Sequence, residues 1–196
     1  STRDRSSAAS DVYKRQIQDS VYDAFTRKLA EAVSAMRVGS ALDGDTEQGP
    51  LINAAALAKV EAHVGDALEK GAKLLCGGRR HALGGTFFEP TILTEAHGEM
   101  LIAQEETFGP VAACFRFKDE TEVLQRANDT PFGLSAYFYS RDIGRVWRMA
   151  EGLEAGMVGI NEGIISTEVA PFGGIKESGL GREGSKYGLD DYLEIK

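Results

Sequence analysis

The amino-acid sequence predicts an α/β protein with a mainly parallel sheet flanked by helices. From residue 17 onward, stretches whose apolar residues recur at helical spacing alternate with short apolar runs bounded by glycine or proline. Successive strands separated by helices pair in parallel through right-handed crossovers, which places helices on the faces of the sheet. The chain has 196 residues, of which 42% are hydrophobic, so it is long enough to bury a sizeable core.

The first half of the chain is expected to supply two helices and several extended segments. The first helix is predicted at residues 20–37 and is ended by Gly39; its buried face is expected to contain Val21, Phe25, Leu29, Val33 and Met36. The second helix is closed by Gly71, and its buried side is marked by Leu57, Val60, Val64 and Leu68. Strands are expected at 73–76 and 111–117, and residues 87–93 are expected to be extended around a proline.

The second half repeats the alternation and then changes character. Asp119 begins a capping-box pattern with Glu122, which predicts a helix through residue 128. A strand at 134–139, a helix at 142–153 and a strand at 157–161 follow, and the predicted buried face of that helix consists of Ile143, Val146, Met149 and Leu153. Residues 161–184 are rich in glycine, which disfavours regular elements, so we expect an ordered loop that builds a site. Residues 191–196 are expected to form a short exposed edge strand.

Residues 1–16 differ from the rest of the chain. They are small, polar and basic and show no periodicity. The run Asp11-Val12-Tyr13-Lys14-Arg15-Gln16 is also what a common sequencing-library transposon end gives when translated in one frame. Our hypothesis is that residues 1–16 are an artefactual leader joined to a truncated gene, so they are excluded from the predicted fold.

Composition excludes several classes of function. A formal net charge of −8 argues against a nucleic-acid partner, which requires clustered lysine and arginine. No apolar run approaches the roughly 20 residues needed to cross a bilayer, and no apolar signal-peptide core begins the chain. The two cysteines, Cys76 and Cys114, suggest a reducing cytoplasm and are expected to be buried and unreactive. His63, His81 and His97 show no metal-ligand spacing and are expected at the surface, so no metal site is predicted.

Two local patterns are candidates for chemistry. Glu105 and Glu106 precede Phe108-Gly109-Pro110, a rigid turn that can hold a carboxylate and an aromatic ring toward one pocket. A carboxylate accepts two hydrogen bonds, which suits the vicinal hydroxyls of a ribose, although solvated carboxylates explain the pair as well. Ser166 follows the last predicted strand and is either a solvated serine or a donor to a substrate carboxylate. The G-x-G-x-x-G text match at 179–184 lacks the strand before it and the acidic residue after it, so it predicts no dinucleotide site.

Several motifs together resemble the C-terminal half of an aldehyde dehydrogenase. They are Gly49-Pro50-Leu51-Ile52, Phe88-Glu89-Pro90-Thr91, the run 105–110, the run 128–135 and Pro171-Phe172-Gly173-Gly174. The runs 163–166 and 184–188 are similar to the succinate-semialdehyde members, which act in 4-aminobutyrate degradation. In that family a cysteine thiolate attacks the aldehyde, hydride passes to NAD or NADP, and a thioester is hydrolysed.

The resemblance assigns roles to four residues of this chain. It implies that Glu106 holds the nicotinamide ribose and that Phe108 lies against the nicotinamide. It implies that Ser166 contacts the substrate carboxylate and that Phe172 forms an aromatic wall of the aldehyde tunnel. It also implies a partial catalytic domain at 17–188, the start of an oligomerisation tail strand at 189–196, and a homo-oligomer, dimer or tetramer, of the full-length protein.

The family's catalytic groups are not expected in this chain. The nucleophilic cysteine, the general-base glutamate and the nucleotide-binding domain match positions upstream of Ile17, and neither Cys76 nor Cys114 has the nucleophile's context. We therefore expect no catalytic residue here, no activity of the isolated chain, and no means of choosing NAD over NADP. Two alternatives stay open: a dehydrogenase for another semialdehyde or an aliphatic aldehyde, and a non-catalytic protein that assembles with full-length subunits.

Overall fold

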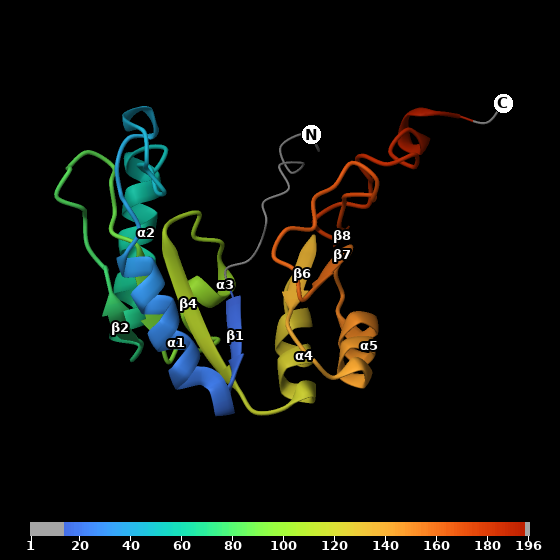
Figure 1. Ribbon diagram of the computed structural model, residues 1–196, viewed down its shortest axis with the longest axis horizontal. Helices are drawn as coiled ribbons and strands as arrows, with labels where there is room; N and C mark the ends of the chain where they lie inside the picture. The colour runs from blue at the N-terminus through green and yellow to red at the C-terminus, as the bar shows by residue number, and fades with distance from the viewer. Residues whose placement is uncertain (1–13, 195–196) are drawn as a thin grey trace. The chain divides into compact units, whose positions relative to one another are not determined.

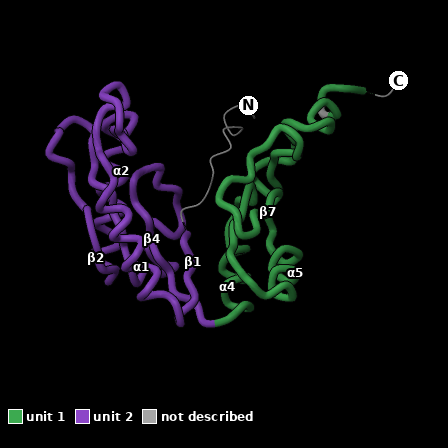
Figure 2. The backbone as a smooth tube through the Cα atoms, viewed as in Figure 1, with its two compact units in different colours: residues 1–12, 119–196 green, residues 13–118 purple. Residues whose placement is uncertain are grey.

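The computed structural model describes residues 14–194, which fall into two compact units. In chain order, the first unit comprises residues 14–118 (purple, unit 2 in the key of Figure 2), and the second comprises residues 119–194 (green, unit 1 in that key) of this described range. Each unit has its own sheet and its own helices (Figure 1). The candidate residues 106 and 108 belong to the first unit, and the candidate residues 166 and 172 belong to the second.

The first unit is built on a four-stranded sheet in the order β1-β4-β3-β2. Its strands are β1 (Lys14–Gln18), β2 (Lys73–Cys76), β3 (Thr91–Thr94) and β4 (Val111–Phe117). β1 and β3 pair in parallel with the central β4, whereas β2 pairs antiparallel with β3 at one edge. The prediction of an α/β fold with a mainly parallel sheet is therefore confirmed.

Helices cover both faces of this sheet, because successive strand residues point to opposite faces. On one face lies α1 (Asp19–Ser34), which packs against Ile92, Ala112 and Cys114. On the other lie α2 (Ala54–Glu69) and the short α3 (Leu101–Gln104), which share a larger apolar cluster with the alternate residues of β3 and β4. A 3-10 turn, η1 (Ala41–Asp43), lies in the connection from α1 to α2.

The buried face of α1 differs from the predicted one. Tyr22 and Thr26 are buried, whereas Val21 and Phe25 are 52% and 44% exposed. Both buried hydroxyls donate to backbone carbonyls, that of Tyr22 to Cys114 and that of Thr26 to Tyr22 itself. Leu29 and Val33 do pack against the buried cluster, as predicted. Polar side chains can be buried when they are hydrogen-bonded, so apolarity alone missed Tyr22 and Thr26.

The folded part of the chain begins before Ile17. Residues 14–16, which the sequence analysis excluded from the fold, form the first part of β1 and pair with residues 113–115 of β4. Their side chains are half-buried, and Ile17 is the first residue of the core. The rest of the expected leader, residues 1–13, lies outside the described residues.

The second unit contains two small sheets and two helices. β6 (Ser135–Phe138) pairs in parallel with β7 (Met157–Ile160), and β5 (Phe132–Gly133) pairs antiparallel with β8 (Ile175–Lys176). The helix α4 (Glu120–Asn128) begins as predicted, with the Asp119 side chain accepting from the backbone N–H of Glu122. In α5 (Ile143–Gly152), Met149 is buried as predicted. Ile143 is nevertheless 79% exposed, and the neighbouring Trp147 is 67% exposed.

The C-terminal segment is not a strand in this structure. Asp190–Tyr192 forms a 3-10 turn, η2, and Leu193 and Glu194 follow it without regular structure. The predicted strand at 191–196 is therefore wrong for its described part, and residues 195 and 196 lie outside the described residues. A strand at the end of a chain gains its hydrogen bonds only from a neighbouring strand, and no strand between residues 14 and 194 pairs with Leu193 or Glu194.

Residues 14–194 contain neither a candidate membrane-spanning helix nor a candidate metal cluster. Between residues 14 and 194, no helix is long and apolar enough to cross a membrane. The same residues contain no cluster of three or more histidine, cysteine or acidic side chains that could hold a metal ion. Cys114 is buried and Cys76 is half-buried, and neither forms a disulfide.

Candidate functional site

The first candidate region is the turn between α3 and β4, residues 105–110. Its start is fixed by the N–H of Glu105, which donates to the carbonyl of Leu101 at 2.8 Å and so closes the last turn of α3. Its end is fixed by the carbonyl of Pro110, which accepts from the N–H of Thr91 at 2.8 Å. The turn is thus held between a helix end and the parallel pair of β3 and β4, at one end of the sheet.

The helix α2 supports this turn from one side. The Thr107 hydroxyl, on a residue only 4% exposed, lies 3.0 Å from Nδ1 of His63, which is 2% exposed. The Glu105 carboxylate lies 3.6 Å from Nε2 of the same ring and 3.7 Å from the ammonium of Lys59. The imidazole of His63 in α2 therefore contacts two side chains of the turn, those of Glu105 and Thr107, and Thr107 lies 44 positions away in sequence.

His63 was expected at the surface, and that prediction is wrong. The signal that could have found it is its position: His63 follows Val60 by three residues and precedes Ala67 by four, so it lies in the apolar stripe of α2. Burial lowers the pKa of His63, and the positive charge of Lys59 lowers it further, while the Glu105 carboxylate opposes both effects. The net effect lowers the pKa of His63 and so favours the neutral imidazole.

The tip of the turn presents an aromatic ring and a carboxylate. Phe108 has a φ of +46°, in the left-handed region, and its side chain is 69% exposed. A β-carbon on Gly109 would lie 2.4 Å from Cγ2 of Val60, so the backbone here touches α2 directly. Glu106 is half-buried between Glu105 and Thr107. Non-glycine residues with positive φ persist only where the surroundings hold them, which is the function of α2 here.

The second candidate region follows β7. Asn161 has a φ of +56°, and its side-chain amide both accepts from the N–H and donates to the carbonyl of Ser140, at 2.8 Å each. This pairing turns the chain away from the sheet. The Glu162 carboxylate then accepts the N–H groups of Gly163 and Ile164 at 2.8 and 3.2 Å. Ser166 lies beyond them, exposed, and its hydroxyl has no hydrogen bond to another described residue.

Backbone contacts tie the glycine-rich segment that carries Phe172 into the second unit. Phe172 and Glu183 exchange two backbone hydrogen bonds, at 2.8 and 2.7 Å. The guanidinium of Arg182 donates to the carbonyl of Gly174 at 2.7 Å. A β-carbon on Gly156 would lie 2.1 Å from the carbonyl oxygen of Gly173, so two backbone segments are in contact there. Phe172 is half-buried on this ordered segment.

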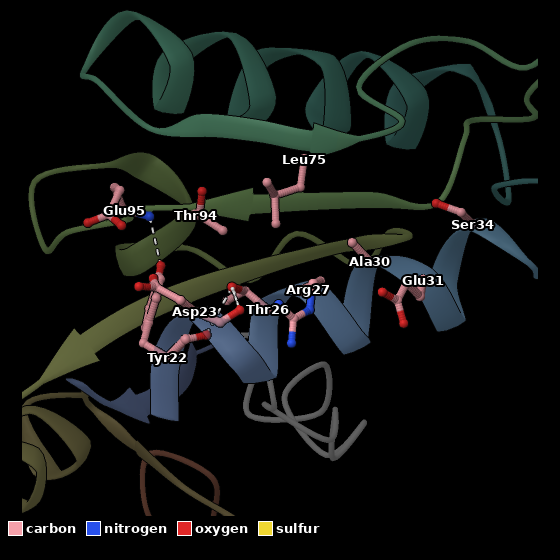
Figure 3. A pocket seen from close by; sticks show the side chains of 10 residues that line it. All are labelled: Tyr22, Asp23, Thr26, Arg27, Ala30, Glu31, Ser34, Leu75, Thr94 and Glu95. Atoms are coloured by element: carbon pink, nitrogen blue, oxygen red, sulfur yellow. Dashed lines mark hydrogen bonds between the residues drawn. The ribbon is translucent and has the colours of Figure 1, made fainter. Parts of the chain in front are cut away.

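A groove in the described part of the first unit does not involve these residues. It has a volume of about 540 Å³ and lies between α1 and the edge of the sheet, where Thr26, Arg27, Leu75, Thr94 and Glu95 are among its lining residues (Figure 3). None of the four residues predicted to bind cofactor or substrate lines it. We therefore do not assign the groove to the candidate site.

Neither cysteine has the environment of a nucleophile. Burial raises the pKa of the Cys114 thiol to about 11, and the side chain is fully buried. The Cys76 sulfur lies 3.8 Å from the carbonyl oxygen of Pro90 in the edge strand β2. The chain has no other cysteine.

Similarity to known proteins identifies the family to which the chain belongs. The model of the aldehyde dehydrogenase family matches residues 7–196. The chain belongs to the aldehyde dehydrogenase family. Among curated relatives of this family member, the glutarate-semialdehyde dehydrogenase of Pseudomonas aeruginosa is 63% identical over 180 residues, 92% of this chain. The NADP-dependent succinate-semialdehyde dehydrogenase of Escherichia coli K12 is 62% identical, and the 3-sulfolactaldehyde dehydrogenase of Pseudomonas putida is 60% identical, over the same length.

Solved structures give the same result for this aldehyde dehydrogenase chain. The succinate-semialdehyde dehydrogenase of Burkholderia pseudomallei matches 92% of the chain with a TM-score of 0.91 and 63% sequence identity. A Staphylococcus aureus betaine aldehyde dehydrogenase in complex with NAD+ matches 93% with a TM-score of 0.87 and 39% identity. The chain spans about 37% of the length of the curated relatives named above and 38% and 37% of these two solved chains.

Proposed function

We propose that this chain is the C-terminal part of an NAD(P)-dependent dehydrogenase whose substrate is an aldehyde with an anionic group at its other end, with succinate semialdehyde as the first candidate. Relatives at 60–63% identity are named for glutarate semialdehyde, succinate semialdehyde and 3-sulfolactaldehyde. Each of these substrates combines an aldehyde with a carboxylate or a sulfonate. Because the three names share this chemistry, they support an acidic aldehyde as the substrate class more strongly than they support any one of the three compounds.

The observation that carries this proposal is the state of Ser166. Its hydroxyl is exposed and forms no hydrogen bond to another residue of the described range, although the N–H groups of Gly163 and Ile164 just before it donate to the Glu162 carboxylate. A hydroxyl on an ordered segment can donate to an anionic oxygen without first breaking a bond within the protein. A hydrogen bond to a charged group contributes about 1.5–3 kcal/mol. Phe172 would supply an apolar wall for the short carbon chain.

The turn at 105–110 supports cofactor binding. A half-buried carboxylate, Glu106, and an exposed aromatic ring, Phe108, lie two positions apart on a turn held by α2. The carboxylate can accept both hydroxyls of a ribose, and the ring can cover one face of a planar heterocycle. Bound there, NAD or NADP supplies the hydride acceptor. These residues would bind and orient it, while the nucleophilic thiolate and the general base come from outside this chain.

Ser166→Ala in the full-length enzyme tests the substrate assignment. We expect the KM for succinate semialdehyde to rise about 10- to 150-fold, because a charge-assisted hydrogen bond worth about 1.5–3 kcal/mol is lost, and the KM for an uncharged aldehyde such as butanal to stay unchanged. Thr167→Val removes an exposed hydroxyl from the next residue and is the matched control, with both KM values expected to stay near wild type. An equal rise in the KM values of both substrates on Ser166→Ala would contradict the role.

The purified chain alone should not form NAD(P)H from an aldehyde. Both of its cysteines lie in strands, and the buried one has a thiol with a raised pKa, so neither can replace the missing nucleophile. The assay is absorbance at the NAD(P)H band with succinate semialdehyde and either nucleotide. Turnover by the chain without an added full-length subunit would overturn this part of the proposal.

A homo-oligomer is part of the same proposal. Leu189, Tyr192 and Leu193, at the C-terminal end, are 63%, 83% and 66% exposed. Three large apolar side chains within five residues mark a surface that a second subunit would cover. Light scattering of the full-length protein should report a dimer or tetramer, and replacing all three residues by serine should lower the assembly state.

A further inference from the structure

We infer that His63 and Thr107 form a positioning pair that sets the orientation of Glu106 and Phe108 and thereby the affinity for the nicotinamide nucleotide. The inference rests on the proposed function, because it assigns a role toward the cofactor of that enzyme. Neither residue touches the nucleotide in this view. They act through the turn at 105–110, which they hold against α2.

The first step concerns the directions of the side chains, because alternate residues of the turn point toward α2 and away from it. Glu105 has extended backbone angles, with φ of −118° and ψ of 143°. Glu105 and Thr107 both reach the His63 ring, at 3.6 and 3.0 Å, as alternate residues of an extended segment do. Glu106, between them, is then directed to the side away from α2. The contacts of its two neighbours therefore set the direction in which the Glu106 side chain leaves the backbone.

The second step is the tautomer of the ring. In neutral imidazole one nitrogen donates and the other accepts. Nε2 faces the Glu105 carboxylate at 3.6 Å, so a proton on Nε2 is attracted to it, whereas a lone pair there would be repelled. Nδ1 consequently accepts, and the Thr107 hydroxyl donates to it across 3.0 Å. The arrangement satisfies a hydroxyl and an imidazole that are both almost completely buried.

The third step is the strain at the tip of the turn. Phe108, directly after Thr107, has a φ of +46°, which L-residues seldom adopt. Gly109 then approaches Val60 so closely that a β-carbon would lie 2.4 Å from its Cγ2. A strained residue between two contacts with the same helix keeps its conformation only while both contacts persist. Without the Thr107 bond, Phe108 can relax, and Glu106 moves with it.

Protonation of His63 would weaken the pair, because the cationic ring donates from both nitrogens and the Thr107 hydroxyl loses its acceptor. The charged groups that face the ring are Lys59 and Asp66 of α2 and Glu105 of the turn. Burial and Lys59 lower the pKa of His63, while Glu105 and Asp66 raise it, and the net direction is downward. Nucleotide affinity should therefore fall only when the pH drops below the ordinary range of histidine.

The test measures dissociation constants of NAD+ and NADP+ for the full-length enzyme by fluorescence titration, which needs no turnover. Thr107→Val keeps the shape and removes the hydroxyl, and we expect a five- to tenfold rise in the constant of the preferred nucleotide, corresponding to about 1–1.4 kcal/mol. Thr107→Ser keeps the hydroxyl and should restore affinity to within about twofold. Thr94→Val is the matched control, since Thr94 is 5% exposed and donates to the carbonyl of Lys73 away from the turn.

A second variant separates positioning from packing. His63→Asn keeps a hydrogen-bonding group near the place of Nδ1 but cannot titrate, so its nucleotide affinity should not fall at low pH as that of the wild type does. The KM for the aldehyde should stay near wild type in both Thr107 variants. The inference is overturned if Thr107→Val binds nucleotide like Thr94→Val or if His63→Asn retains the acid decline. It is also overturned if the wild type binds neither nucleotide. Wild-type binding without turnover of any acidic aldehyde would instead contradict the proposed function alone.

Discussion

Replacing Tyr22 by phenylalanine should destabilise the first unit by about 2 kcal/mol through one orphaned backbone group. The Tyr22 hydroxyl accepts from the N–H of Glu95 at 2.8 Å and donates to the carbonyl of Cys114 at 2.9 Å. Figure 3 shows the first of these bonds. The Cys114 carbonyl also accepts from the N–H of Ala96 at 3.1 Å, so it keeps a partner in the variant. The Glu95 N–H loses the partner that the hydroxyl supplies.

The expected loss of about 2 kcal/mol follows because the Glu95 N–H loses its partner whereas the Cys114 carbonyl keeps one. An unsatisfied buried donor costs about 1–3 kcal/mol, and the Glu95 N–H, on a half-buried residue, faces the buried Tyr22 side chain; the still-bonded carbonyl adds little. The ring of Tyr22 remains in the variant, so its stacking with the Arg116 guanidinium, 3.8 Å from the ring centre, is preserved. Glu95 has a φ of +56°, and loss of its N–H bond also frees a strained residue.

Urea unfolding of the purified chain, followed by circular dichroism, measures the change in free energy of unfolding. Hydrogen exchange of the Glu95 amide measures the local effect, for which 2 kcal/mol corresponds to about 30-fold faster exchange. Tyr192→Phe is the control: Tyr192 is 83% exposed, and its change should stay within about 0.5 kcal/mol. Unchanged exchange at Glu95 together with wild-type stability in Tyr22→Phe would refute the argument.

Three further predictions concern pH, thiol reactivity and backbone contact. Burial raises the pKa of Tyr22 from 10.0 to about 12, so the stability that this shift contributes below pH 10 should be lost as the pH rises to 12. The urea midpoint of Tyr22→Phe should therefore decline less over this pH range than that of the wild type. The native chain should react with iodoacetamide at the half-buried Cys76 far faster than at Cys114, as mass spectrometry of peptides would show, and equal rates would contradict the buried thiol. Gly156→Ala places a β-carbon 2.1 Å from the Gly173 carbonyl oxygen, so limited proteolysis should cut residues 161–184 faster than in wild type; an unchanged digestion pattern would oppose this.

The elements that the sequence predicted well are those whose signals are local. The helix N-cap at Asp119 forms as expected, because its side chain and the N–H of Glu122 lie within one turn of α4. The strand 111–117 was predicted with its observed bounds, since its apolar run is buried on both faces for most of its length. Such features need no knowledge of what the rest of the chain does.

The features that the sequence did not reveal depend on distant partners. Tyr22 is buried because a backbone carbonyl 92 positions away accepts its hydroxyl proton. His63 is buried because Thr107 and Glu105 meet it from another segment. In both cases a polar side chain enters the core together with its partner, and periodicity of apolar residues cannot show the partner. The resemblance named Glu106 and Phe108, while the contacts that support their turn became visible only in three dimensions.

The single tryptophan makes the two units distinguishable by spectroscopy. Trp147 lies in α5 of the second unit, 67% exposed, and the chain contains no other tryptophan. Its emission therefore reports only the environment of residues 119–194, while amide exchange at Glu95 reports only residues 14–118. One denaturant series read by both signals would reveal whether the units unfold as one cooperative transition or as two.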